Sequence, residues 1–217
     1  MGSRNLYLYA MKISERKKHW ETVFETKDTT KVSWYQPVPE TSLRLIDGLN
    51  LSKTSRIIEV GSGDSFLVDF LLKKGYSDIT LLDISEKALD TIRKRVLEKS
   101  EKITFLVGDV TEHLSVEKFD IWHDRAVFHF LASENDIHKY VKNVVSNLGA
   151  EGYLILGTFS TEGPDICSGL KVQKYSEKQL TETFKNGFKK IECFTENHKT
   201  PSGASQNFLF CVFQKIN

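Results

Sequence analysis

The sequence predicts an α/β fold: a doubly wound, seven-stranded, mostly parallel sheet whose last strand is antiparallel. Short apolar segments alternate with amphipathic segments between residues 56 and 160, which is typical of a parallel sheet covered by helices on both faces. A glycine-rich turn, EVGSG, ends the first apolar segment. The last two apolar segments are separated only by HKTPSGAS. That loop is too short for a crossover helix, so they are expected to form an antiparallel hairpin.

Two helices are expected ahead of the sheet. Residues 14–26 carry an apolar stripe that includes Trp20 and Val23, and Ser14 is the expected N-cap. Residues 40–49 place four aliphatic side chains on one face. Between the helices, WYQPVPE contains two of the four prolines. It is expected to be an extended loop, because proline fixes its own φ and restricts the preceding residue.

Strands and helices then alternate along the chain. Ser85 and Ser176 are expected to cap the helices that follow them, and Gly75 is suited to the position after a helix end. The expected strands are 56–60, 78–83, 102–109, 118–124, 151–160, 188–197 and 206–216, and the expected helices are 65–75, 85–99, 134–148 and 176–186. Right-handed crossovers between the parallel strands then build the doubly wound sheet.

Length and composition indicate one domain. The chain has 217 residues, enough to bury a sizeable core, and we expect a domain over residues 53–217 with N-terminal helices and a lid over residues 13–52. Residues 1–12, which begin Met-Gly-Ser and contain a second methionine, are expected to be a disordered added leader. Lys and Arg number 30 and Asp and Glu 29, so net charge does not favour nucleic acid or an anionic membrane as a partner.

The three cysteines are expected to stay unpaired. Cys167, Cys193 and Cys211 match no disulfide or metal-ligand spacing, so a reducing, cytoplasmic setting is predicted and no metal site is predicted. No apolar segment approaches the roughly 20 residues that span a bilayer.

The EVGSG turn is the first candidate for ligand binding. Gly61 and Gly63 remove side chains where backbone would meet a ligand. In a doubly wound sheet, ligands lie at the carboxyl ends of the strands, where the strand order reverses. A dinucleotide fold favours G-x-G-x-x-G, but the third position here is Phe66. A tight turn without a ligand is the structural alternative.

Polar residues at the neighbouring strand ends extend this candidate site. Glu59 would crowd a pyrophosphate but suits an ammonium group or the amides of the turn. Asp83, followed by Ile84, can accept from both ribose hydroxyls or cap the next helix. Asp109 can accept from an adenine amino group, and Val110 offers an apolar face. Together they trace an amino acid, a ribose and an adenine, which is the outline of S-adenosylmethionine (SAM).

These motifs, in this order, resemble the Rossmann-like (class I) SAM-dependent methyltransferases. The match covers about residues 15–217 and includes E-V-G-S-G, Asp83, the Gly-Asp pair at 108–109 and the terminal hairpin. Ser65 stands where that family often has a third glycine. More narrowly, W-x-x-x-F, V-S-W-Y-Q-P and F-D-I-W-H-D-R-A-V-F-H-F-L resemble a subgroup of small bacterial-type methyltransferase-domain proteins. The resemblance implies the fold and SAM as cofactor, and it leaves the methyl acceptor open.

The resemblance also implies that residues near the end of the fourth strand approach the methionine part of SAM and the acceptor. Asp124 is the candidate for the donor's ammonium group or for a general base, and Arg125 for an anionic acceptor. His129 is a second candidate base, and His123 a candidate acceptor contact. The alternatives are a structural ion pair between Asp124 and Arg125 and histidines that are simply buried.

Two loops are expected to shape the acceptor side. In the lid, Tyr35 is expected to contact SAM and Trp34 the acceptor. The alternative is that the two rings close the open side of the sheet as a hydrophobic clasp. Residues 158–176 are too irregular for a helix and are expected to form a loop at the mouth of the site, where Cys167 and Tyr175 line the pocket.

The leading prediction is a SAM-dependent methyltransferase that acts on a small-molecule acceptor. One alternative is a protein lysine methyltransferase, suggested by the Asp-Arg pair that ends the fourth strand. The others are a SAM-binding protein without turnover and an NAD oxidoreductase, against which Phe66 argues. An enclosed pocket would favour a small acceptor, and an open acidic groove would favour a protein side chain.

Overall fold

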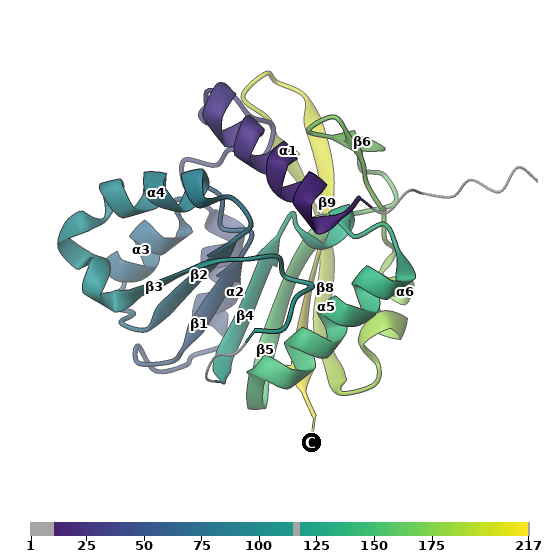
Figure 1. Ribbon diagram of the computed structural model, residues 1–217. Coiled ribbons are helices and arrows are strands. Elements are labelled where there is room, and N and C mark those ends of the chain that lie inside the picture. Colours follow the sequence, from purple (N-terminus) through teal and green to yellow (C-terminus); the bar gives the residue numbers. More distant parts are fainter. Residues whose placement is uncertain (1–10, 115–117, 217) are drawn as a thin grey trace, which may run out of the picture.

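The centre of the protein is a seven-stranded sheet (Figure 1). The computed structural model describes residues 11–114 and 118–216, so the expected leader falls outside the described residues except for its last two. In spatial order the strands are β3 (Ile103–Val107), β2 (Ile79–Asp83), β1 (Ile57–Val60), β4 (Phe119–Arg125), β5 (Leu148–Phe159), β9 (Ser205–Lys215) and β8 (Phe188–Lys199). The strands β1 to β5 are mutually parallel, and β9 is antiparallel to both neighbours. The predicted fold class and terminal hairpin are confirmed.

Helices cover both faces of the sheet. The helices α2 (Glu40–Gly48), α3 (Leu67–Lys73) and α4 (Glu86–Arg95) pack on one face, and α5 (Glu134–Asn147) and α6 (Glu177–Phe184) on the other. Successive strand residues point to opposite faces, so Ile57 packs in the first layer and Ile58 in the second. Each layer is a continuous apolar core, which holds the strand ends at one edge in fixed register.

The helix α1 (Ile13–Thr26) lies across one end of the sheet rather than on a face (Figure 1). Its Val23 is buried, and the Trp20 ring meets Trp34 and Phe130 edge-on, at centroid distances of 5.9 and 5.0 Å. The helix therefore covers the edge where β4 ends.

The helix ends differ in detail from those expected. Ser85 and Ser176 do cap α4 and α6, accepting hydrogen bonds from Ala88 and Gln179 N–H groups. Ser14 does not cap α1: the helix starts one residue earlier, and the Glu15 carboxylate accepts from the Lys12 N–H at 3.0 Å. The helix expected over 85–99 ends at Arg95, and a 3-10 turn, η1 (Leu97–Lys102), leads into β3.

The loop over residues 158–176 contains a short antiparallel ribbon that was not predicted. Its strands are β6 (Ile166–Cys167) and β7 (Leu170–Lys171). Ser168 and Gly169 connect them with φ values of 50° and 78°, and two positive φ values are what a tight hairpin of this kind requires. The Ser-Gly pair was therefore a hairpin signal in the sequence.

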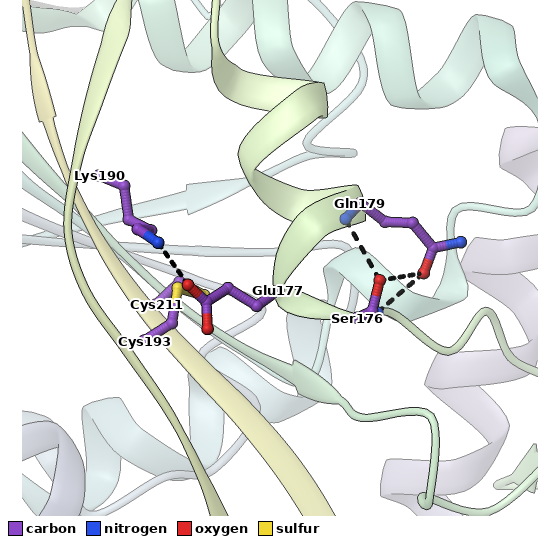
Figure 2. The surroundings of a disulfide bond; sticks show 6 residues. All are labelled: Ser176, Glu177, Gln179, Lys190, Cys193 and Cys211. Carbon is purple, nitrogen blue, oxygen red and sulfur yellow. Dashed lines mark hydrogen bonds and ion pairs between the residues drawn. A yellow bond between two sulfur atoms is a disulfide. The ribbon is translucent and has the colours of Figure 1, made fainter.

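A disulfide joins Cys193 on β8 to Cys211 on β9 (Figure 2). The prediction that these two cysteines stay unpaired is wrong. They lie 18 residues apart in sequence, but the hairpin register places them directly opposite each other, with Cα atoms 4.2 Å apart, within reach of a disulfide. Beside them, Lys190 of β8 pairs with Glu177 at the start of α6 (Figure 2). Cys167 stays free and buried.

None of the helices in the described part of the chain is long and apolar enough to cross a membrane.

Candidate active site

The glycine turn between β1 and α3 is shaped by its surroundings. Gly61 and Gly63 have φ values of 61° and 55°, a region that side chains disfavour. A Cβ atom on Gly61 would lie 1.9 Å from Val127 Cγ2, and one on Gly63 would lie 3.1 Å from the Phe24 ring of α1. Both glycines are therefore needed for the packing of the turn, and they also leave backbone open to the pocket that the turn lines.

Asp83, at the end of β2, binds the turn directly. One carboxylate oxygen accepts from the Gly63 N–H at 2.7 Å, and the other accepts from the Ser85 N–H at 2.8 Å. Burial is the main cause that raises the pKa of Asp83, to about 6. The alternative that Asp83 caps the following helix is not what the structure shows, because Ser85 takes that position.

Glu59, on β1, is the second buried acid of the site. Its Oε1 accepts from the Ser65 hydroxyl at 2.8 Å, and Ser65 Oγ in turn accepts from the Leu67 N–H at 3.0 Å. Among the described residues, Oε2 has no hydrogen-bond partner. Burial raises the pKa of Glu59 to about 8. Ser65 therefore orients the Glu59 carboxyl group through its hydroxyl, which a glycine at this position lacks.

Asp109 is paired with a residue that the sequence did not point to. Arg16 of α1 lies 3.0 Å from Asp109 Oδ2, measured from Nε, and it also pairs with Asp136 at 3.1 Å. Its Nη2 donates to Thr111 Oγ1 at 3.2 Å. Asp109 Oδ1 accepts from the N–H and the hydroxyl of Thr111. The adenine-binding candidate is thus held by the N-terminal helix.

One pocket joins these strand ends, with about 1320 Å³ of open space that includes solvent at its mouth. It runs from Asp109 after β3 to Gln206 and Phe208 on β9, beneath α1 and the segment that contains Trp34 and Tyr35. Eight aromatic side chains line it: Trp20, Phe24, Trp34, Tyr35, Phe66, Phe130, Phe159 and Phe208. Gly61, Gly63, Ile84, Val110 and Cys167 also line it, as do all three acids described above.

His123 and Arg125 reach this pocket from β4. His123 Nε2 is 2.8 Å from Ser42 Oγ of α2, and its Nδ1 has no hydrogen-bond partner among the described residues. Burial lowers the pKa of His123 to about 3, so its ring is neutral near pH 7. Arg125 Nη1 donates to the Trp34 carbonyl at 3.1 Å. The lid segment is therefore bonded to the strand that carries the acceptor candidates.

Asp124 points to the opposite face of the sheet, and the pocket lining does not include it. Its carboxylate accepts from the Tyr140 hydroxyl of α5 at 2.6 Å and from the Val127 N–H at 3.0 Å. Tyr140 in turn accepts from Trp122 Nε1 at 3.2 Å. This placement does not favour Asp124 as a base or an ammonium ligand. The alternative, an ion pair with Arg125, does not form among the described residues either, because neighbouring strand residues face opposite sides.

His129 and Tyr175 are also placed away from the pocket lining. His129 is fully buried and stacks on Phe159 with 4.2 Å between ring centroids. Burial lowers its pKa to about 3, which suits neither a base at neutral pH nor a charged group. Tyr175 is buried against Phe128, 5.1 Å away between centroids. The expectations of a catalytic His129 and an acceptor-contacting Tyr175 are not supported by this placement.

In the described part of the chain, no cluster of three or more His, Cys, Asp or Glu side chains could hold a metal ion.

Arg16, Ser42, Gln206 and Phe208 are the site residues that sequence reasoning missed. Arg16 lies on the same face of α1 as Trp20 and Val23, which follow it by four and seven residues, and this helical spacing was a usable signal. Gln206 and Phe208 alternate along β9, and this period of two was a usable signal once the hairpin was placed beside the fifth strand.

A doubly wound sheet of this strand order, with a glycine turn and acidic strand ends around one pocket, defines a Rossmann-like, SAM-dependent methyltransferase. The chain belongs to the Methyltransferase domain family, whose model matches residues 51–209, and SAM is its cofactor.

Known proteins similar to the chain agree with this assignment. EEF1A lysine methyltransferase 2 of Danio rerio is 22% identical over 209 residues, which cover 93% of this chain and 84% of that protein. A SAM-dependent methyltransferase structure from Anabaena variabilis matches with a TM-score of 0.74 at 16% identity, covering 96% of this chain and 99% of the other. The Burkholderia thailandensis 1,6-didemethyltoxoflavin-N1-methyltransferase, which binds S-adenosylhomocysteine, matches with a TM-score of 0.71 at 15% identity over 94% and 87%.

Proposed function

We propose that this methyltransferase transfers the methyl group of SAM to a small-molecule acceptor held in the aromatic part of the pocket. The observation that carries the proposal is the extent of that pocket. It continues past the glycine turn, over the ends of β4, β5 and β9, beneath aromatic side chains of α1 and the lid. Acidic strand ends line one part of this pocket and aromatic side chains line the other, an arrangement that suits a donor with a second, small molecule beside it.

The residues at the β1, β2 and β3 ends fit the donor. The unpartnered Oε2 of Glu59 suits the donor's ammonium group, and each Asp83 oxygen accepts a single backbone N–H and retains a lone pair for a ribose hydroxyl. Asp109, with Val110 and Ile84 beside it in the lining, would hold the adenine end. Tyr35, edge-on to Phe66 at 6.2 Å between centroids, would close over the donor.

Positioning, rather than base catalysis, is the contribution expected from the protein. Bound SAM supplies a methyl group on a positively charged sulfur. His123 is the one histidine in the pocket lining, and its pKa of about 3 makes it a weak proton acceptor. The chain's own work is then to orient the acceptor and to exclude water, which suits an acceptor atom that already carries a free lone pair.

Residues 13–52 would form the lid of this site. Trp34 is joined to β4 through the Arg125 hydrogen bond, and Trp20 packs on Phe130. Opening the lid requires these contacts to break, so we propose that acceptors enter by its displacement.

The second candidate is methylation of a lysine side chain in a protein. The observation that favours it is the relative from Danio rerio, EEF1A lysine methyltransferase 2, whose similarity extends over 93% of this chain. The aromatic pocket lining would also accommodate an alkyl chain.

Transfer of an isotope-labelled methyl group from SAM tests both candidates. The purified chain is incubated with small thiols, amines and hydroxyl compounds, and separately with purified eEF1A and a cell lysate. Label in a small molecule supports the proposal, and label confined to lysine residues of a protein replaces it with the second candidate. The Asp83→Ala variant, with donor binding weakened, is the matched control.

A further inference from the structure

Among the described residues, the acceptor half of the pocket contains one partly buried cation, Arg125. We define this half as the lining residues on or over β4, β5 and β9: Trp20, Trp34, His123, Arg125, Phe159 and Phe208. The donor candidates stand on the other side of Glu59, at the ends of β2 and β3. Arg125 lies one strand beyond Glu59, toward β9, where its guanidinium carbon is 5.0 Å from the centre of the Phe208 ring.

The guanidinium of Arg125 is incompletely satisfied. Its Nη1 donates to the Trp34 carbonyl at 3.1 Å, whereas its Nη2 is buried and has no hydrogen-bond partner among the described residues. Within the same part of the chain, no carboxylate forms an ion pair with it. Burial lowers the pKa of Arg125 only to about 10, so the group is still a cation at neutral pH.

Two acids act on this charge from beyond ion-pair distance. Glu59 and Glu196 both act on Arg125 electrostatically. Both Glu196 oxygens, however, lie 2.6–2.7 Å from the Thr41 hydroxyl. Glu59 is bonded to Ser65, and its raised pKa of about 8 leaves it mostly protonated in the free protein at neutral pH. In the proposed donor complex its carboxylate pairs with the donor's ammonium group instead of with Arg125. A partly buried cation without a contact ion pair is costly, and a ligand that carries a negative charge would offset that cost.

Building on the proposed function, we propose that the acceptor is an aromatic or apolar acid whose carboxylate binds Arg125. A guanidinium presents two parallel N–H groups that match a carboxylate, and Nη2 is free to donate. The walls around it are aromatic rings, which accept a flat apolar body. His123 Nδ1 and Gln206 Oε1, both without partners among the described residues, offer a hydrogen bond to a second polar group of the acceptor.

The same reasoning disfavours lysine as the acceptor. An ammonium group brought beside an unpaired guanidinium meets a like charge in a poorly solvated site, where charge interactions are strong. The alternative source of the anion is the donor itself, whose amino acid end also bears a carboxylate. Because Arg125 stands on the β9 side of Glu59, we assign it to the acceptor, and the experiment separates the two sources.

Calorimetric titration of the protein saturated with S-adenosylhomocysteine measures the anion site directly. The probes are 4-aminobenzoate and 4-mercaptobenzoate, each compared with its own amide, which has nearly the same shape without the charge. We expect the acids to bind at least about tenfold more tightly than the amides, the usual size of a charge-assisted hydrogen bond. In Arg125→Gln this preference disappears, and in Arg125→Lys it is partly retained.

Two controls isolate the effect. Arg44→Gln removes an exposed cation of α2 that stacks on Phe194 and does not line the pocket, and it is expected to keep the preference for acids. S-adenosylhomocysteine and 5′-methylthioadenosine, which lacks the amino acid end, are titrated into wild type and Arg125→Gln. Their affinities are expected to change by less than about threefold, since the variant alters no donor contact in this assignment.

Three outcomes would overturn the proposal. The first is equal binding of acids and amides to the wild type, and the second is no detectable binding of any probe acid. The third is a loss of S-adenosylhomocysteine affinity in Arg125→Gln without a loss of 5′-methylthioadenosine affinity, which would assign Arg125 to the donor's carboxylate. None of these readouts requires turnover. A preference for acids combined with methyl transfer only to proteins would therefore overturn the proposed function and leave the anion site intact.

Discussion

Arg16 of α1 and Asp109 after β3 form a buried ion pair, with 3.0 Å between Nε and Oδ2. The same helix reaches the end of β2 through Glu21, which accepts from the Ser85 hydroxyl and the Glu86 N–H, both at 2.9 Å. The helix α1 therefore contacts the ends of both β2 and β3, which are proposed to hold the ribose and the adenine of SAM. We therefore expect donor binding and closure of the proposed lid to favour each other.

Replacing Arg16 with Gln is expected to reduce both stability and donor affinity. The change leaves Asp109 and Asp136 buried without their cation, and breaking one side of a buried pair costs about 3–5 kcal/mol of unfolding free energy. Denaturant unfolding and SAM titration measure the two effects. Lys17→Gln, an exposed neighbour, is the control and should change stability by less than about 0.5 kcal/mol. An Arg16→Gln protein as stable as the control would show that the pair contributes no net stability.

Donor binding is expected to release a proton from Glu59. In the free protein the pKa of Glu59 is raised to about 8, so the carboxyl group is mostly protonated near pH 7. A donor ammonium group beside Oε2 favours the carboxylate, so SAM affinity should rise with pH between about 6 and 8. Calorimetry in two buffers with different ionisation enthalpies measures the number of protons released when SAM binds. Glu59→Gln should abolish the release that comes from this residue. An unchanged proton count in that variant would remove Glu59 from the donor site.

The same shift predicts how the stability of the free protein depends on pH. Because the folded-state pKa of Glu59 is raised above its ordinary value of 4.5, the folded protein holds a proton that the unfolded chain has lost. The stabilising contribution is complete below about pH 4.5 and is lost as pH rises through about 8. Unfolding free energies measured across this range should fall less steeply in Glu59→Gln than in the wild type.

His129→Phe is expected to preserve turnover and to keep or increase stability. Phe retains the stacking on Phe159 and removes two ring nitrogens that are buried without hydrogen-bond partners among the described residues. An unsatisfied buried polar group costs about 1–3 kcal/mol. Thermal unfolding and the methyl-transfer rate constant are the measurements. A large fall in kcat with unchanged SAM affinity would restore His129 as a catalytic base.

Reduction of the Cys193–Cys211 disulfide is expected to lower the unfolding free energy by up to about 3 kcal/mol, as expected for a loop of this length. The Cys193→Ser, Cys211→Ser double variant should match the reduced protein and should not respond to reductant. Thiol titration of the unfolded, unreduced protein should find Cys167 alone. Three reactive thiols would mean that the pair forms no disulfide in solution. Disulfides persist mainly in oxidising compartments, so the cytoplasmic location expected from the sequence stays a prediction, which cell fractionation tests.

The parts of this protein that were predictable depend on local patterns. Alternating apolar segments, serine caps and a short final loop were enough for the sheet and its hairpin, because hydrophobic period and turn chemistry act over a few neighbouring residues. The grouping of the acidic residues was predictable for the same reason. Parallel strands end at one edge of the sheet, so one pocket is lined by Glu59, Asp83 and Asp109. The alternation along β4 was also visible in the sequence, and it would have separated Asp124 from His123 and Arg125.

By itself, then, the sequence determined the fold class and the edge at which the donor-site candidates gather. Only the tertiary structure decided which polar groups are partnered and which face the pocket. Arg16 meets Asp136 across 120 residues, and Cys193 meets Cys211 through hairpin register. Arg125 keeps an Nη2 that has no hydrogen-bond partner in the described part of the chain. These relationships arise when elements distant in sequence pack together, and burial then sets the charge of each group.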